Sequence, residues 1–375
     1  FEAFFFGKIQ GGSIVPQLFQ TVIVAGFGLE HWQQKHGLED MEGQLVLEDF
    51  LVEAEESVQI ELILRNTGKL MKPFVGTRLR LKPEFVPDGE TTPWFEKDQL
   101  GAGGTVQFKT WLWPHQEASC TVGVRLAKRG RYILEPLRVV CGDFLGLKEQ
   151  VRQERGFHEL IVPPKECEMP AVEAAVGGVL GSLSVNRYLY EDPILTAGYR
   201  EYTSGDPMRS ISWKQSARGR GLMVKKFDYT TEPRVVVLVH ADDADGQAEA
   251  VEICYSMART ACRMLEEKAI AYRFVVNTSF DLLMNAAFAD SNWNAPLEVP
   301  QGYGPEHFRR VLEMLGRACG QPARSCEAFF AKDLHPQEQQ SLIVLTNTPD
   351  LVRGALPSLP GVEPLILTPE EGRQA

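Results

Sequence analysis

Arg234-Val235-Val236-Val237-Leu238-Val239 is the stretch that decides the fold of the C-terminal part of the chain. It is a continuous apolar run rich in β-branched residues, which is typical of a strand buried on both faces of a parallel sheet. Residues 248–268 follow with apolar side chains at helical spacing. Further elements are expected as strands at 272–276, 342–345 and 365–367 and as a helix at 306–318. This alternation predicts a doubly wound, three-layer α/β domain over residues 233–375.

Short segments with alternating apolar and polar residues fill the preceding stretch, 41–165. Residues 57–64 alternate and end at the turn sequence Asn66-Thr67-Gly68. Similar strands are expected at 77–81, 105–113, 119–126 and 137–141. Alternation with many turns and no long helical period predicts an antiparallel β-sandwich. We find no catalytic constellation in this stretch, so its expected role is positioning or binding.

Residues 1–40 do not fit a soluble enzyme. Residues 13–29 carry no charge over 17 positions, at the short end of the roughly 17–25 residues that cross a bilayer as a helix. Gln17 and Gln20 weaken this interpretation, whereas Trp32 suits a membrane interface. The alternative is an amphipathic or core helix. The segment lacks the features of a secretory signal peptide, and we favour a membrane-associated N-terminal segment.

The composition limits the remaining classes of function. A length of 375 residues with 44% apolar and 24% charged residues suggests two or three domains. The net charge of -11 argues against a protein whose whole surface binds nucleic acid. The seven cysteines are scattered without a CxxC pair, and no Cys or His cluster has zinc-ligand spacing. There is no P-loop, dinucleotide fingerprint or nucleophile elbow. We therefore predict no metal, no cofactor and no catalytic residue.

Residues 166–232 connect the two predicted domains and contain the most distinctive stretch of the chain, GYREYTSGDPMRSISWKQSAR at 198–218. Gly205-Asp206-Pro207 is a strong turn sequence. Seven cations lie within residues 200–226, beside the aromatic faces of Tyr202 and Trp213. In a structural interpretation, which we favour, arginines pair with Asp206, Glu201 and Glu232 and hold this segment on the α/β domain. In a functional one, the cations bind a phosphate, an anionic lipid head group or an acidic partner.

This stretch resembles the family known as domain of unknown function 58, which carries the pattern R-x-Y-x-x-G-D-x-x-R-x-I-x-W-x-x-x-A-R. The matching positions are Arg200, Tyr202, Gly205, Asp206, Arg209, Ile211, Trp213, Ala217 and Arg218, and a trailing acid of the family falls on Glu232. A second similarity is the R-G-x-Y at 129–132 followed by D-x-x-G-L at 143–147. The residues expected to form the structural ion-pair cluster and its turn are therefore Arg200, Tyr202, Gly205, Asp206, Arg209, Trp213, Arg218 and Glu232.

The resemblance implies that the C-terminal domain is related to the von Willebrand factor A fold. Metal-binding members of that fold carry D-x-S-x-S after the first strand. Here His240 takes the place of the first Asp in the loop 240–246, and both serines are missing. Ligands of open α/β sheets bind at the C-terminal ends of the strands. We therefore predict a partner-binding surface there, with no metal, formed by His240, Asp242, Asp243, Asp245, Thr346 and Asn347.

The resemblance further implies a non-enzymatic, membrane-tethered adaptor or assembly factor that works beside a MoxR-type AAA+ ATPase. The expected location is the inner or plasma membrane with the soluble domains in the cytoplasm, and no nucleic acid is expected as a partner. Two alternatives stay open. One is a membrane-associated hydrolase whose triad, with His240 as base, is built across domains. The other is a binder of anionic lipid or nucleic acid that uses Arg200 to Lys226.

Overall fold

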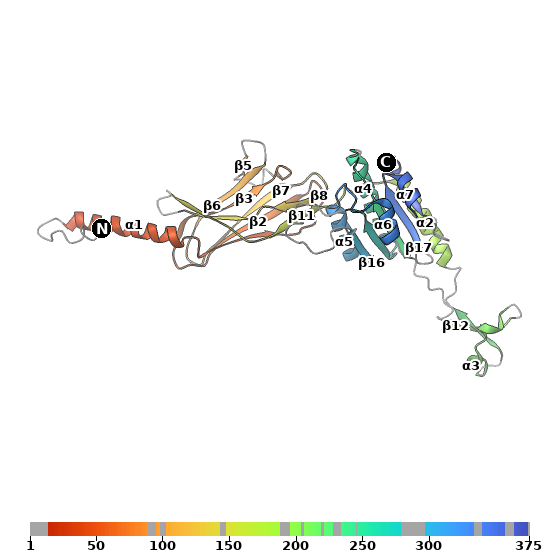
Figure 1. Cartoon of the computed structure of the whole chain (residues 1–375). Helices are drawn as coiled ribbons and strands as arrows, with labels where there is room; N and C mark the ends of the chain where they lie inside the picture. Colours follow the sequence, from red (N-terminus) through yellow and green to blue (C-terminus); the bar gives the residue numbers. More distant parts are fainter. Residues whose placement is uncertain are drawn as a thin grey trace. The chain divides into compact units, whose positions relative to one another are not determined.

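The computed structural model describes residues 14–88, 95–97, 103–142, 148–187, 196–203, 206–218, 221–227, 234–244, 246–278, 297–333, 340–356 and 364–373. The chain divides into two compact units, 1–162 and 163–375 (Figure 1). The sequence pattern predicts the end of the sandwich domain at residue 165, three residues beyond the end of the first unit. Each unit has its own apolar core and is described separately.

The first unit is a helix followed by antiparallel sheets. Helix α1 spans Ile14–His36. One sheet has the order β1-β2-β7-β4 and the other β10-β9-β3-β6-β5, and a separate pair joins β11 to β8. The strands are β1 (Met41–Leu47), β2 (Ser57–Asn66), β3 (Lys72–Leu81), β4 (Val86–Pro87), β5 (Phe95–Lys97), β6 (Gly104–Leu112), β7 (Glu117–Arg125), β8 (Gly130–Leu134), β9 (Arg138–Gly142), β10 (Glu149–Gln153) and β11 (His158–Val162). All of these pairings are antiparallel, which confirms the prediction of antiparallel sheets.

The two larger sheets of this unit pack face to face. In β2 the alternate residues Val58, Ile60 and Leu62 are buried in one apolar cluster with Leu79 and Leu81 of β3. The intervening residues of β2 are mostly less buried. The period-2 pattern in the sequence therefore corresponds to one inward face of the strand.

A membrane-spanning helix was expected within residues 1–40, of which the structure describes 14–40. No helix in the described part of the chain is both long and apolar enough to span a bilayer. What α1 does show is a set of large apolar side chains that are exposed, namely Leu18, Phe19, Val22, Ile23, Val24 and Phe27.

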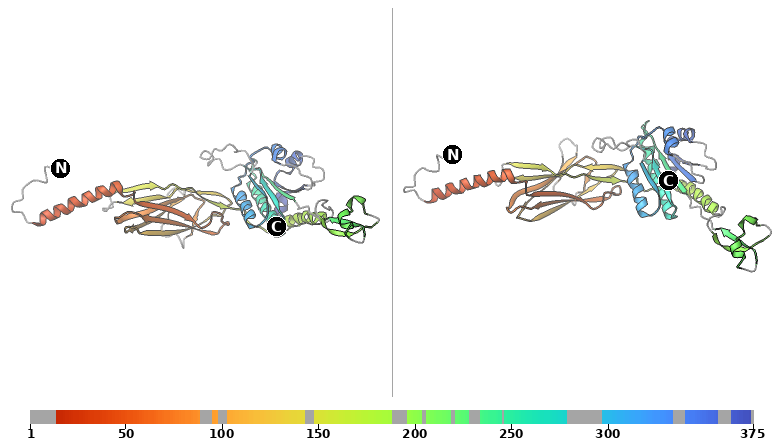
Figure 2. Two further views of the ribbon diagram at one scale, coloured as in Figure 1. Left: turned by 90° about the horizontal axis from the view of Figure 1, so that it is seen from below. Right: turned by 60° about the horizontal axis from the view of Figure 1, so that its bottom comes forward.

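The second unit is a mixed sheet with helices on both faces. Its strand order is β16-β15-β14-β17-β18, with only β16 antiparallel to its neighbour. The strands are β14 (Arg234–His240), β15 (Tyr272–Val276), β16 (Leu297–Gly302), β17 (Gln340–Thr346) and β18 (Leu365–Leu367). The helices are α2 (Pro170–Arg187), α4 (Ala248–Glu267), α5 (Pro305–Arg317), α6 (Cys326–Asp333), α7 (Pro349–Ala355) and α8 (Pro369–Arg373). Both views in Figure 2 show the sheet between helices.

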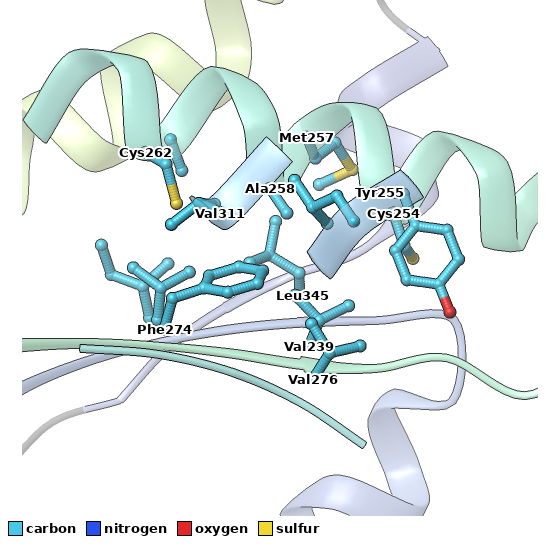
Figure 3. Packing of buried hydrophobic residues seen from close by; sticks show 14 of the residues in the cluster. Val239, Cys254, Tyr255, Met257, Ala258, Cys262, Phe274, Val276, Val311 and Leu345 are labelled. Atoms are coloured by element: carbon cyan, nitrogen blue, oxygen red, sulfur yellow. The ribbon is translucent and has the colours of Figure 1, made fainter. Parts of the chain in front are cut away.

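Strand β14 is apolar between its ends because it contacts both helical layers. Val237 and Val239 belong to the cluster formed with α2, α4 and α5. Val236 and Leu238 belong to the cluster formed with α6 and α7. Figure 3 shows Val239 below α4 in the first of these clusters. The predicted strands at 234–239, 272–276, 342–345 and 365–367 and the helices at 248–268 and 306–318 are confirmed to within a few residues.

The distinctive stretch forms a small hairpin within this unit. Strands β12 (Thr196–Glu201) and β13 (Met223–Phe227) pair antiparallel. Between them lie a 3₁₀ turn, η2 (Met208–Ser210), and the single helical turn α3 (Trp213–Ser216). We call residues 196–227 the motif hairpin.

Candidate functional site

The C-terminal ends of β14, β15 and β17 bring buried polar side chains together. His240 ends β14 and is only 2% exposed. Its Nδ1 lies 2.9 Å from the side-chain nitrogen of Asn277, which follows β15. An amide NH₂ can only donate, so Nδ1 accepts and the ring proton belongs on Nε2. Burial lowers the pKa of His240 below its ordinary value, although the Asp242 carboxylate opposes the shift. His240 is therefore a neutral, positioned ring.

A segment of the chain itself covers these strand ends. Asn277 accepts from the backbone N–H of Arg324 at 3.1 Å and donates to its carbonyl oxygen at 2.9 Å. Thr278 donates to the Cys319 carbonyl at 2.8 Å and accepts from the Cys319 N–H at 3.0 Å. The Asp243 N–H donates to the Gly320 carbonyl at 2.8 Å. Residues 319–324, here called the covering loop, are thus held across the sheet edge by both strands.

Asn347 fixes the loop that follows β14. Its amide nitrogen donates to the Asp242 carbonyl at 2.7 Å, and its amide oxygen accepts from the Asp242 N–H at 3.0 Å. The Asp242 carboxylate in turn accepts from the Ala244 N–H at 3.0 Å. The side chains of Asp242, Asp243 and Asn347 are half-buried.

The structure separates the six residues predicted to bind a partner. His240 and Thr346 are buried, so their side chains are not part of the exposed surface in this structure. Asp242, Asp243 and Asn347 stay near the surface, and Asp245 lies outside the described residues. Within the described ranges, no three His, Cys, Asp or Glu side chains gather closely enough to hold a metal ion. No local sequence pattern marks Asn277 and Thr278, whose partners in the covering loop are more than 40 positions away.

The motif hairpin contains the predicted ion pair between Arg200 and Asp206. One guanidinium nitrogen donates to Asp206 Oδ2 at 2.7 Å, and a second donates to Oδ1. The backbone N–H and hydroxyl of Thr203 donate to the same Oδ2 at 2.9 and 2.8 Å. The Arg200 hydrogen bond, followed by those from Thr203, holds the pKa of Asp206 well below its usual range. The pair closes a turn within the hairpin, which differs from the predicted attachment to the α/β domain.

A small buried core supports the rest of the hairpin. Ile211 and Val224 are buried, and an isolated antiparallel bridge pairs them. Ser216 Oγ accepts from the Met223 N–H at 2.8 Å, and the Ser212 N–H donates to the Met223 carbonyl at 2.8 Å. These contacts explain how so short a segment holds a defined conformation.

The outer surface of the hairpin is aromatic, apolar and cationic. Met208 is 70% exposed and Trp213 is 64% exposed. Exposed with them are Tyr199, Leu222, Arg200, Lys214, Arg218 and Lys225. Tyr202 is half-buried, whereas Gly205, Glu232 and the side chain of Arg209 lie outside the described residues. Large exposed apolar side chains together with cations are a typical feature of binding surfaces.

The buried state of His240 makes a prediction about pH. In the unfolded chain an imidazole takes up a proton below about pH 6.5, whereas the folded His240 resists protonation. The unfolded state then binds more protons, so stability falls as the pH drops below that value, by up to about 1.4 kcal/mol per pH unit. Hydrogen exchange of the β14 amides should show this slope between pH 7.5 and 5.5. His240→Gln should flatten it and His158→Gln, in the other unit, should not; a slope that survives His240→Gln contradicts the assignment.

Comparison with known proteins agrees with the motif. The model of the family described as "Protein of unknown function DUF58" matches residues 198–345, from β12 to β17. The "Uncharacterized protein YeaD" of Bacillus subtilis is 26% identical over 160 residues, which cover 41% of this chain and 39% of that protein. The matched part thus spans about two fifths of the length of this relative.

Solved structures give weaker similarity. A CARDB domain from Pyrococcus furiosus matches with 12% identity and a TM-score of 0.21, covering 33% of this chain and 87% of that one. A cohesin module from Clostridium perfringens matches with 10% identity and a TM-score of 0.24, covering 32% and 96%. Scores this low support no inference about fold or function. The sequence match and the motif together confirm that residues 198–345 carry the sequence of the DUF58 family of unknown function.

Proposed function

We propose that this protein is a non-enzymatic adaptor that is tethered to a membrane and binds a protein partner through the motif hairpin. The family resemblance implies a MoxR-type AAA+ ATPase as that partner. It also implies a place at the inner or plasma membrane, with both compact units in the cytoplasm. Half-buried Asp242, Asp243 and Asn347 at the strand ends form a second candidate surface for the same partner.

The exposure of Met208 and Trp213 is the observation that carries the protein-binding part of the proposal. Trp is the residue most enriched among side chains that dominate binding energy at protein interfaces. Here the Arg200–Asp206 pair and the small hairpin core hold the backbone that presents these two side chains. The surrounding cations favour a partner with an acidic surface.

The strand arrangement supports a von Willebrand factor A-like interpretation of residues 233–375. Parallel strands β14, β15 and β17 lie at the centre of the sheet, with helices on both faces and an antiparallel strand at one edge. The loop after β14 holds Asp242 by hydrogen bonds to Asn347. This loop would then be a protein-binding relative of the metal-dependent loops of that fold.

The surface of α1 supports the membrane part of the proposal. Six large apolar side chains of this helix are exposed, among them Phe19 at 69% and Phe27 at 65%. Burial of these apolar side chains between the head groups and the acyl chains of a bilayer would remove them from water. Association with a membrane surface therefore needs no spanning segment.

The position of His240 favours an adaptor over a hydrolase. Its Nδ1 is bonded to Asn277, and its ring is stacked on Phe329 with 6.3 Å between the ring centroids. A general base must reach the proton that it removes, and the covering loop is fastened over this edge of the sheet. We therefore assign His240 a positioning role.

Affinity capture of the ATPase by the full chain tests the proposal. Met208→Ala with Trp213→Ala should weaken the interaction about ten-fold or more, since removal of a hot-spot side chain costs about 2 kcal/mol. Tyr303→Ala is the matched control, because Tyr303 is 63% exposed on the same unit but outside the hairpin. Asp242→Ala with Asp243→Ala tests the strand-end surface. Unchanged affinity in both double variants would overturn the proposal, and binding of the hairpin to anionic vesicles alone would favour the lipid alternative.

A further inference from the structure

We propose that the end of the β-sandwich next to α1 is a second membrane contact, in which Leu70, Phe74, Trp111 and Trp113 enter the interfacial layer of a bilayer. We call these four residues the aromatic edge. The inference rests on the proposed membrane association of α1, and it adds a specific lipid-binding surface on the folded sandwich.

The four side chains come from neighbouring segments. Asn66 donates through its side-chain nitrogen to the carbonyl oxygens of Leu70 at 2.9 Å and Trp113 at 3.0 Å, which joins the two turns that carry them. The rings of Trp111 and Trp113 meet edge to face with 6.2 Å between centroids. The pairing of β3 with β6 is irregular between Lys72 and Val75, so that Pro73 and Phe74 together lie across from Trp111.

All four side chains are substantially exposed. Trp111 and Trp113 are 53% and 55% exposed, and Leu70 and Phe74 are similar. Single exposed apolar residues are common on soluble proteins, but a contiguous group of this kind marks a binding surface. Two of its members are Trp, the residue type whose amphipathic ring is enriched at membrane interfaces.

The same end of the sandwich receives the end of α1. Lys72, buried, donates from Nζ to the Gly37 carbonyl at 3.0 Å. Arg152 donates to the carbonyl oxygens of Leu38 and Met41. The Thr67 N–H donates to the Asp40 carbonyl at 2.8 Å. The helix is therefore tied to the turns that carry the aromatic edge.

This attachment limits the distance between the aromatic edge and the bilayer. Helix α1 ends at His36 and β1 begins at Met41, so four residues separate them. The five Cα-to-Cα steps from His36 to Met41 reach at most about 18 Å when fully extended. If the apolar surface of α1 lies in the interface, the end of the sandwich has to lie at the head groups. The apolar surface of α1 and the aromatic edge would then form one continuous membrane-binding surface.

The charges around the edge point to a bilayer without a strong requirement for anionic lipid. The exposed cations here are Lys35, Arg65, Lys69 and Lys109, and the exposed acids are Glu39, Glu42 and Glu117. Arg65 lies opposite Glu42 and Glu117 in the sheet. Because the two signs nearly cancel, the electrostatic attraction to anionic head groups is small. Binding should depend mainly on the apolar side chains, and it should occur on phosphatidylcholine vesicles.

Quenching of Trp fluorescence tests the inference. The full chain is mixed with phosphatidylcholine vesicles whose acyl chains carry bromine, which quenches only Trp residues that enter the bilayer. Trp111→Phe with Trp113→Phe should remove a large share of the quenching while preserving binding. Trp111→Glu with Trp113→Glu should weaken binding about ten-fold or more. Tyr303→Glu, which places a charge at an exposed aromatic position outside the aromatic edge and the motif hairpin, should leave the affinity for vesicles unchanged.

The outcomes separate this inference from the proposed function. No binding of the full chain to vesicles would overturn both the membrane association of α1 and the aromatic edge. The aromatic edge alone would be overturned by two results together. The Trp111→Phe, Trp113→Phe variant would be quenched as strongly as the original chain, and the Trp111→Glu, Trp113→Glu variant would bind vesicles with unchanged affinity. Circular dichroism checks that the sandwich of each variant is folded, which is expected because the side chains changed are exposed.

Discussion

Replacing Phe274 with alanine is expected to destabilise the α/β unit by about 3–5 kcal/mol, the range for a fully buried Phe→Ala substitution. Phe274 lies in β15 and is completely buried. Figure 3 shows its ring between α4 and the strands, in the cluster that also contains Cys262 and Val311. Removing the ring leaves a cavity that the two rigid layers cannot fill, so the lost packing adds to the lost burial.

The measurement is hydrogen exchange of the β14 and β15 amides, because it reports on this unit without contribution from the sandwich. Tyr303→Ala is the control and should change the stability by no more than about 0.5 kcal/mol, since Tyr303 is an exposed surface residue. A loss of less than about 1 kcal/mol for Phe274→Ala would contradict the central position of this ring in the core.

The central strands could be predicted because burial on both faces requires a continuous run of apolar residues in the sequence. Strand β14 must be apolar at every position between its ends, since adjacent residues face different helical layers. Strand β16 has no continuous apolar run. It is an antiparallel strand at the edge of the sheet, it contains Pro300, and only Leu297 and Val299 are buried. Such a short alternating segment is compatible with many loops.

Helix α2 escaped prediction for a different reason. Gly177, Gly178 and Gly181 lower its intrinsic helix propensity, so the segment reads as a small-residue linker. The structure shows Val172, Val176 and Leu180 buried against the cluster around α4. These three positions lie four residues apart, a helical spacing that could have revealed the helix. Tertiary packing overrides the weak local propensity here.

The candidate site could be predicted only where its residues lie close together in the sequence. Arg200 and Asp206 are six positions apart within one hairpin, and they form the expected ion pair. The positions of His240 and Thr346 at strand ends also follow from the strand pattern. The surroundings of His240 do not follow from that pattern, because Asn277 joins His240 to the covering loop across 47 positions. No local pattern encodes a contact of that range.

Replacing Asn277 with alanine is expected to release the covering loop and to destabilise this edge of the sheet by about 3 kcal/mol. Asn277 is only 1% exposed. Its side chain donates to His240 Nδ1 and to the Arg324 carbonyl oxygen, and it accepts from the Arg324 N–H. The substitution leaves these partners without their bonds, and each buried polar group left unsatisfied costs about 1–3 kcal/mol. Opening of the covering loop would let water bond the groups that Asn277 leaves unsatisfied. The loss of stability should therefore appear as faster hydrogen exchange that is confined to residues 319–324 and the end of β14.

Asn347→Ala is the matched control for this change. Asn347 also makes two amide hydrogen bonds with one backbone residue, Asp242, but its side chain is half-buried. Water can replace bonds near the surface, so we expect a loss of about 1 kcal/mol and no change in exchange at residues 319–324. Equal losses of stability in Asn277→Ala and Asn347→Ala would contradict the expectation that the more deeply buried hydrogen bonds contribute more. Protection of the covering loop that survives Asn277→Ala would show that Thr278 and Asp243 hold it without Asn277, and the strand ends would then stay closed in both variants.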